Sequence, residues 1–305
     1  MAFVASDPRA ALNTTASAGA PQTGLIADEQ LGRFYLTPPQ IASGAEKTWL
    51  LRGQNFVLAW SECSPGAELA RADQPDEYVI LLTDAASRAR VAWEGEEVEV
   101  SGPQIVFVPG GASRVVLPDG GRVTRLFTVK SADLVSRCPN AGAYEKARPH
   151  IPPFAAWPDP VGGWKIRAYA LDVAPEPGRF GRIFRCTTFM LNVFEPMAGP
   201  RDPAKMSPHS HDDFEQCSLV VGGHFVHHLR WPWTTDLADW RDDLHLDVGA
   251  PSALVIPPPV IHTSQATGIG DNDLVDIFCP PRHDFSLKDG WVINAADYPM
   301  PGNGA

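Results

Sequence analysis

The sequence has few cysteines and no pattern among them. Five cysteines are scattered through 305 residues, and no CxxC pair occurs. A thiolate metal site uses closely spaced pairs, and a disulfide framework uses an even set at regular spacing. We therefore expect reduced thiols in a cytoplasmic protein.

Concentrated positive charge and long apolar runs are also missing. The net charge is −11 and there is no lysine- or arginine-rich run, which argues against nucleic acid and anionic membranes as partners. No uncharged apolar run reaches the 18 residues of a membrane span. The first 24 residues lack the basic and apolar regions of a secretory signal, so we expect a disordered tail there.

Histidine is absent from the first 149 residues of the chain. All nine histidines lie at or after position 150. An imidazole metal site or a histidine acid–base catalyst therefore has to be built from the second half.

What the chain has in quantity is turn residues, and these punctuate two similar stretches. Thirty prolines and 26 glycines favour short strands joined by turns. In each stretch an acidic residue opens the first of three strands and a proline-rich turn closes the third. The first stretch runs from Glu77 to Arg114 and the second from Glu215 to His262; the ten extra residues of the second form a tryptophan-rich insertion at 231–240. This pattern indicates an internal duplication and an all-β protein of two tandem barrels, in which closure removes exposed strand edges.

The duplication gives a division of the chain. It predicts a tail at 1–24, a first barrel at 25–138, a linker at 139–164, a second barrel at 165–285 and a C-terminal tail at 286–305. Six prolines mark the linker segment.

Four residues of the second half predict a metal site. His209 and His211 are two apart, so they share one face of an extended segment. Glu215 lies four further on with the same parity, and His262 follows a proline turn on a distant strand. Three imidazoles and one carboxylate suit one divalent ion of Mn, Fe, Co, Ni, Cu or Zn and leave positions open for substrate, as in catalytic sites.

These residues carry a resemblance to a known family. His209-Ser-His211-Asp-Asp-Phe-Glu215, six residues and Gly222, followed by Pro257-Pro-Pro-Val-Ile-His262, resemble the two motifs of the cupin superfamily. The resemblance covers roughly residues 190–280. It implies that both barrels are cupin (double-stranded β-helix, or jelly-roll) barrels and that the four residues are the metal ligands.

The first barrel matches this pattern without its ligands. Superposing the repeats puts Arg71, Asp73 and Glu77 at the first-motif positions and Arg114 where His262 stands. One interpretation is a degenerate barrel kept for packing, with these side chains in buried ion pairs. The other is an anion-binding pocket around Arg71 and Arg114.

The strand after Gly223 offers candidates for catalysis. Strand alternation puts His224, Val226, His228 and Arg230 on one face and Phe225, His227 and Leu229 on the other. The sequence does not decide which face is the lumen. If the first set points inward, His228 or His224 is a candidate general acid or base, Arg230 a carboxylate-binding residue and Glu215 a second proton carrier.

Several other residues have two interpretations each. His245 is either a pocket residue or a surface residue, and Ser264 and Gln265 could donate hydrogen bonds to a metal-bound ligand. Trp231, Trp233 and Trp240 could cover the barrel mouth or fill a homodimer interface. We expect no chemical role for His150 and His283.

The resemblance implies a range of functions. We expect a metal-dependent enzyme, with a dioxygenase-type oxidoreductase acting on a small oxygenated organic substrate as the leading hypothesis. A metal-dependent isomerase, epimerase or lyase is the alternative enzyme class. The third hypothesis is a non-enzymatic cupin that binds a small molecule.

Overall fold

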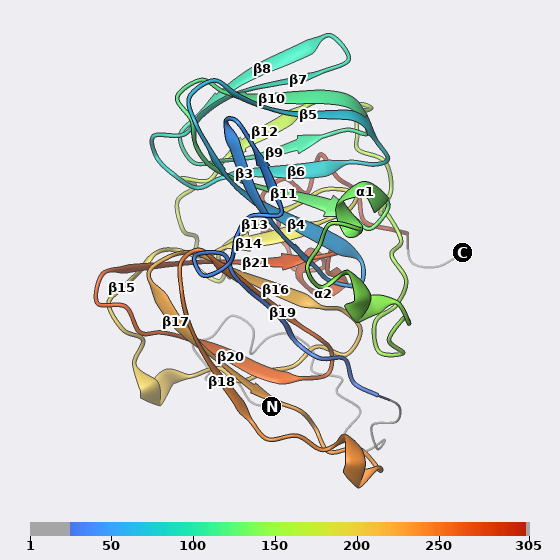
Figure 1. Ribbon diagram of the computed structural model, residues 1–305, viewed down its shortest axis with the longest axis vertical. Coiled ribbons are helices and arrows are strands. Elements are labelled where there is room, and N and C mark those ends of the chain that lie inside the picture. Colours follow the sequence, from blue (N-terminus) through green and yellow to red (C-terminus); the bar gives the residue numbers. More distant parts are fainter. Residues whose placement is uncertain (1–24, 303–305) are drawn as a thin grey trace.

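The computed structural model describes residues 25–302, so the tail expected at 1–24 and the last three residues lie outside the described part of the chain. Figure 1 shows two β-barrels, with the first half of the chain above the second. Among the described residues the α-helices are two short ones, α1 (Ala132–Val135) and α2 (His283–Ser286). The all-β class and the tandem barrels predicted from the sequence are confirmed.

The first barrel consists of two antiparallel sheets. Its strands are β2 (Ile41–Ser43), β3 (Glu46–Arg52), β4 (Phe56–Cys63), β5 (Ala67–Gln74), β6 (Tyr78–Leu82), β7 (Arg88–Trp93), β8 (Glu96–Ser101), β9 (Gln104–Val108), β10 (Gly111–Leu117), β11 (Gly121–Thr128) and β12 (Arg167–Ala170). The larger sheet has the order β12-β9-β6-β11-β4-β3-β2, and the smaller has the order β5-β10-β7-β8.

The second barrel repeats this arrangement. Its strands are β1 (Gln30–Arg33), β13 (Arg182–Arg185), β14 (Met190–Val193), β15 (Met197–Ala198), β16 (Gln216–Gly222), β17 (His224–Arg230), β18 (Leu244–Gly249), β19 (Ser252–Ile256), β20 (Ile261–Ala266) and β21 (Asp271–Phe278). The larger sheet has the order β1-β19-β16-β21-β14-β13, with β15 on β21, and the smaller has the order β18-β17-β20. Short 3₁₀ helices are η2 (Ala141–Tyr144), η3 (Pro203–Lys205) and η4 (Leu237–Asp239).

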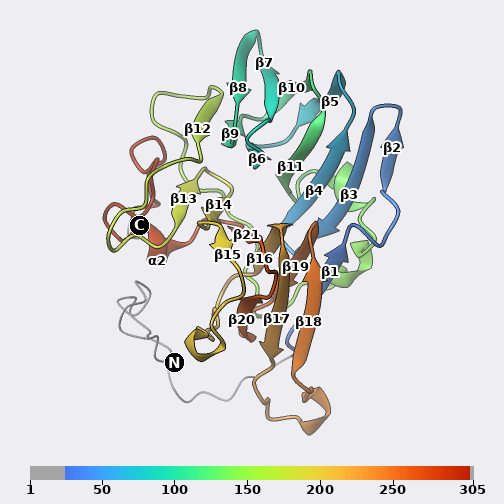
Figure 2. The ribbon, with the colours of Figure 1, turned by 90° about the vertical axis from the view of Figure 1, so that its left-hand side faces the viewer.

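The two halves exchange an edge strand. Strand β1, from the start of the chain, pairs antiparallel with β19 of the second barrel, and β12 pairs antiparallel with β9 of the first (Figure 2). Each barrel therefore contains one strand that the predicted division gave to the other barrel. Residues 30–33 complete the second barrel and residues 167–170 the first, because each larger sheet gains its last strand from across the linker.

The two larger sheets pack against each other between the barrels. Val79 and Leu81 of β6, for example, share one buried core with Cys217 and Leu219 of β16. The intervening residues of each strand face a barrel lumen, so these strands are buried on both faces. This double burial explains why they read as nearly continuous apolar runs.

The lumen of the first barrel is filled with apolar side chains, among them Tyr78 and Phe127 stacked at 5.1 Å between ring centroids. Arg71 makes a bidentate ion pair with Asp133 at 2.7 and 3.0 Å. Arg114 lies half exposed on the outer face. The two arginines do not share one pocket. The lumen is packed as the degenerate-barrel interpretation expects, but the expected buried ion pairs are not formed at Arg114, whose partners Glu68 and Glu97 are half exposed.

Two buried glutamates join the barrels reciprocally. Glu215, which precedes β16, accepts a hydrogen bond from the backbone N–H of Gln54 (2.7 Å) and from the Tyr144 hydroxyl (2.6 Å). Glu77, which precedes β6, accepts from the backbone N–H of Thr187 (2.8 Å) and from the Tyr298 hydroxyl (2.7 Å). Each carboxylate thus crosses to the other half and meets the turn before β4 or β14 together with one tyrosine.

The tyrosines come from segments that the sequence assigned to the linker and the C-terminal tail. Tyr144 ends η2 and is buried, and Tyr298 is only 1% exposed. The linker is also held by Gln54, whose side chain bonds the backbone of Arg148 and Ile151 at 2.7 Å each. Both segments are therefore part of the packed interface.

We expect Tyr144→Phe and Tyr298→Phe each to lower the free energy of unfolding by about 1–3 kcal/mol, because each leaves a buried carboxylate oxygen without its donor. Urea unfolding followed by tryptophan fluorescence measures this. Tyr35→Phe is the control. Tyr35 is 45% exposed and its hydroxyl accepts one solvent-exposed hydrogen bond, from the Gly249 backbone at 3.2 Å, so its loss should change stability by less than about 0.5 kcal/mol. We call the two glutamates with their tyrosine and backbone donors the interbarrel clamp. Losses of stability in the Tyr144 and Tyr298 variants no larger than that of the control would contradict a stabilising role for this clamp.

Candidate metal centre

Three of the four predicted ligands lie together inside the second barrel. The ligand nitrogens of His209, His211 and His262 all fall within 4.8 Å of one another. His209 and His262 form an antiparallel bridge in which each backbone N–H donates to the carbonyl of the other, at 3.0 and 2.7 Å. This bridge joins the segment before β16 to β20 and so fixes the spacing of the imidazoles.

Local hydrogen bonds set the orientation of two of these rings. Nδ1 of His209 lies 3.0 Å from the carbonyl oxygen of Ser207, and Nδ1 of His262 lies 2.9 Å from that of Val260. A carbonyl only accepts, so Nδ1 carries the proton in both rings and the lone pair is at Nε2. Such a backbone bond behind the ring is the usual way in which a metal-binding histidine is held.

His211 is held by a side chain instead. Its Nε2 lies 2.9 Å from Oε1 of Gln216, whose amide group donates to Ser218 Oγ (3.0 Å) and Asp276 Oδ1 (3.1 Å). Burial, reinforced by Arg282 and the other two histidines, holds the pKa of His211 well below its usual value. The ring is therefore neutral, as a metal ligand must be, and Gln216 places an amide oxygen beside the cluster.

Glu215 differs from the sequence expectation, because its carboxylate is engaged in the clamp with Gln54 and Tyr144 and is not part of the histidine group. Equal parity places residues on one face only along a regular strand, and here the chain bends at 212–213 and β16 begins only at Gln216. Glu215 then shares a face with Cys217 and the interbarrel core, while Gln216 faces the lumen. The signal was present in the sequence: an equivalent glutamate, Glu77, stands in the half that has no histidine.

The residues of β17 that face the lumen are Phe225, His227 and Leu229, the set opposite to the one that carries the catalytic candidates. His224 and His228 are only partly buried and Arg230 is exposed, whereas Phe225 and Leu229 are buried in the lumen. The three catalytic candidates on this strand thus lie on the outer face. Their expected roles assumed the opposite orientation, and the large apolar residues of the second set were the indication of the inner face.

The histidine that does face the lumen is His227. It is 1% exposed, and its Nδ1 lies 2.8 Å from Ser264 Oγ. Burial, then His262 and His228, lower the pKa of His227 to about 3, so the ring is neutral at ordinary pH. Ser264 belongs to the lumen as the sequence suggested, whereas Gln265 contacts His228 on the outer face.

A row of polar side chains continues from Gln216 across the floor of the barrel. Ser218 donates to Asp276 at 2.7 Å, and Asn192 is the cross-strand neighbour of Asp276 on β14. Asn192 is 1% exposed, and neither atom of its amide group has a hydrogen-bond partner among the described residues. Gly181, with φ of +74°, lies so close that a Cβ there would stand 2.1 Å from the Asn192 oxygen.

Aromatic side chains form the wall next to the histidines. Phe214 stacks on His211 with 4.4 Å between ring centroids. The Arg282 guanidinium is buried between Phe214, Phe278 and Phe285 and lies 3.6 Å from the Phe285 ring centroid. The three histidines thus lie against an apolar wall, with one buried cation behind it.

The tryptophans of the 231–240 insertion divide into two groups. Trp231 is buried, whereas Trp233 and Trp240 stack in parallel at 4.2 Å and are 70% and 40% exposed. Of the histidines expected to have no chemical role, His283 packs on Trp157 with 4.8 Å between ring centroids.

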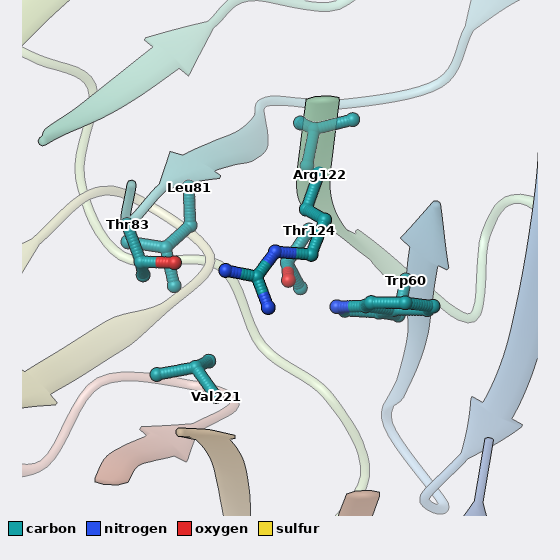
Figure 3. A pocket seen from close by; sticks show the side chains of 7 residues that line it. Trp60, Leu81, Thr83, Arg122, Thr124 and Val221 are labelled. Carbon is teal, nitrogen blue, oxygen red and sulfur yellow. The ribbon is translucent and has the colours of Figure 1, made fainter. Parts of the chain in front are cut away.

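A small cleft between the barrels lies apart from the histidines. Figure 3 shows the Arg122 side chain reaching toward Trp60 and Thr83, with Val221 of the second barrel opposite. Its volume of about 10 Å³ holds roughly one water molecule. It is too small for an organic substrate, and the histidine cluster remains the candidate site.

No protein-family model matches the chain, and no curated protein matches it in sequence. Solved structures do match over most of its length. Oxalate decarboxylase from Lactobacillus farciminis, in a formate complex, has a TM-score of 0.55 at 14% identity, covering 86% of this chain and 90% of that one. AerE from Microcystis aeruginosa has a TM-score of 0.54 at 8% identity, covering 85% and 100%. Escherichia coli YlbA has a TM-score of 0.52 at 9% identity, covering 87% and 96%. These likenesses show the fold, which is that of a bicupin.

The donor set fits a divalent transition metal. Imidazole nitrogen suits Mn, Fe, Co, Ni, Cu and Zn, whereas Mg²⁺ and Ca²⁺ take oxygen ligands. His209, His211 and His262 would hold the ion, and Gln216 could add an oxygen. In addition, none of the helices within residues 25–302 is long and apolar enough to cross a membrane.

We expect His209→Ala and His262→Ala to lose the bound metal, because each removes one of three neutral donors. Glu215→Gln should keep it, because its side chain faces the interbarrel core. Elemental analysis after dialysis, with folding checked by circular dichroism, measures this. Metal loss in Glu215→Gln equal to that in His262→Ala would instead make the carboxylate a ligand.

Glu215 should also give the stability a defined pH dependence. Burial raises its pKa from 4.5 to about 7. The folded state then binds the proton more tightly than the unfolded state, so this stabilisation is complete below about pH 4.5 and is lost as the pH rises to about 7. In metal-stripped protein the free energy of unfolding, relative to Glu215→Gln, should fall by about 3 kcal/mol over that range. A difference that does not change with pH would refute the assignment.

Proposed function

We propose that this protein is a metal-dependent bicupin enzyme whose single centre is held by His209, His211 and His262. The dioxygenase type is the finer proposal, with a small oxygenated organic substrate. The observation that supports it is the set of three imidazoles gathered in the lumen, with the nearby carboxylate of Glu215 turned away.

This donor set has two chemical consequences. Three neutral ligands leave the charge of a divalent ion uncompensated, which favours an anionic or enolisable substrate. A set of three protein ligands would also leave the ion accessible to substrate oxygens, as in non-haem oxygenase sites that use three protein ligands. When bound, the ion would supply Lewis-acid and one-electron chemistry there.

The chain's own residues would bind and orient the substrate. The Phe214, Phe278 and Phe285 rings exclude water from one side of the lumen. The neutral His227–Ser264 pair and the unpartnered amide of Asn192 offer hydrogen bonds to substrate oxygens without adding charge. Glu215 is not available as the proton carrier, since it lies in the interbarrel clamp.

A lyase, such as a decarboxylase of small acids, is the second candidate. It is favoured by the likeness to oxalate decarboxylases, together with a lumen lined by small polar groups. An isomerase or epimerase would use the same centre without oxygen. A non-enzymatic binding protein would hold the ligand unchanged.

We expect protein loaded with Fe²⁺, Mn²⁺ or Ni²⁺ to consume dioxygen with at least one of a panel of diketones, phenols, hydroxy acids and oxalate. An oxygen electrode and product analysis measure this. His262→Ala should have no activity above background, and Glu215→Gln should retain it. Substrate turnover under argon without oxygen uptake would instead assign the lyase or isomerase class, and binding without turnover the non-enzymatic one.

A further inference from the structure

The outer face of the smaller sheet of the second barrel carries a second group of metal-ligating side chains. On this face three side-chain pairs connect β17 and β18: His224 with Asp247, which lie diagonally, His228 with His245, which are directly opposite, and Arg230 with Asp243. Both histidines of the middle pair reach solvent. The lumen centre lies on the opposite face, since His227 points inward and its neighbour His228 outward.

The middle pair has the spacing of two ligands of one ion. Nδ1 of His228 lies 2.7 Å from Nδ1 of His245, and the two residues are directly opposite in the strand register. Two imidazole nitrogens at about 2.0–2.1 Å from one ion are about 2.9 Å apart in octahedral and about 3.3 Å apart in tetrahedral geometry. Opening the pair by roughly 0.2–0.6 Å therefore admits an ion, a movement within the reach of two side-chain torsions.

The hydrogen bonds of His228 leave the lone pair of its ring on the nitrogen that faces His245. Nε2 of His228 lies 3.2 Å from Gln265 Oε1. Because an amide oxygen accepts a hydrogen bond, Nε2 carries the proton and the lone pair of His228 is at Nδ1. His245 then donates its Nδ1 proton to that lone pair. Because the other nitrogen of His245 can carry this proton instead, a cation can replace the shared hydrogen with both Nδ1 atoms as ligands.

The surrounding charge favours a cation. Asp243 and Asp247 flank His245 on the same face of β18, two residues to either side. The one nearby positive charge on β17, Arg230, is already paired with Asp243 through a bidentate contact at 2.9 and 2.5 Å. Asp247 is 71% exposed at its side chain, and its Oδ1 lies 3.2 Å from Nε2 of His224.

We propose that His228 and His245 form a second, peripheral site for a divalent transition ion of the zinc class, with water completing its coordination. This site is separate from the lumen centre and does not depend on the proposed enzymatic function. Its ligands come from the two strands whose connection carries the 231–240 insertion.

Zn²⁺ titration by isothermal calorimetry tests this proposal. His228→Ala and His245→Ala should each bind one ion fewer per chain than the unmutated protein. His224→Ala is the matched control, because it removes a histidine of the same strand and face but should leave the number of ions unchanged. Circular dichroism confirms that these surface variants remain folded.

Co²⁺ gives a second measurement. Its visible absorption should lose one component in His228→Ala and a different one in His262→Ala, so failure of the lumen centre and failure of the peripheral site are distinguishable. Unchanged stoichiometry in both His228→Ala and His245→Ala overturns the proposal. So does an equal loss in His224→Ala.

Discussion

The reciprocal burial of two glutamates is the constraint on which the arrangement of the protein depends. A carboxylate moved out of water is costly unless its oxygens receive hydrogen bonds, and here the donors come from the opposite half of the chain. Neither barrel can satisfy its own glutamate. The linker and the C-terminal segment each supply a tyrosine, so segments without regular sheet structure become indispensable to the interface.

This constraint shapes the histidine centre as well. Because Glu215 is turned toward the interface, the next residue, Gln216, faces the lumen and links His211 to Ser218 and Asp276. A neutral amide oxygen of Gln216 therefore lies beside the three imidazoles, where the carboxylate of Glu215 was expected. The preference for an anionic substrate in our proposal follows from that replacement.

The predictable and the unpredictable parts of the centre differ in what they depend on. His209, His211 and His262 could be found because an HxH spacing and a histidine after a proline turn carry their geometry locally. The orientation of Glu215 depends on a bend at 212–213 that no residue type enforces, and its one indication in the sequence was the equivalent glutamate Glu77 in the half without ligand histidines. For β17 the sequence contained both sets of residues, and only the packing of Phe225 and Leu229 decided that His227 faces inward. The duplication was visible as a repeat, but the exchange of β1 and β12 was not, because strand pairing across the linker leaves no periodic signal.

The exchange of β1 and β12 has a consequence for how the two halves could exist apart. Cleavage of the chain within the linker would leave β1 on the N-terminal fragment, although it completes the second barrel. It would leave β12 on the C-terminal fragment, although it completes the first. Each fragment would present an unpaired sheet edge of the kind that recruits other chains. The two pieces would therefore be expected to reassemble with each other or to aggregate, and a single barrel of this protein is not a modular unit that can be transplanted.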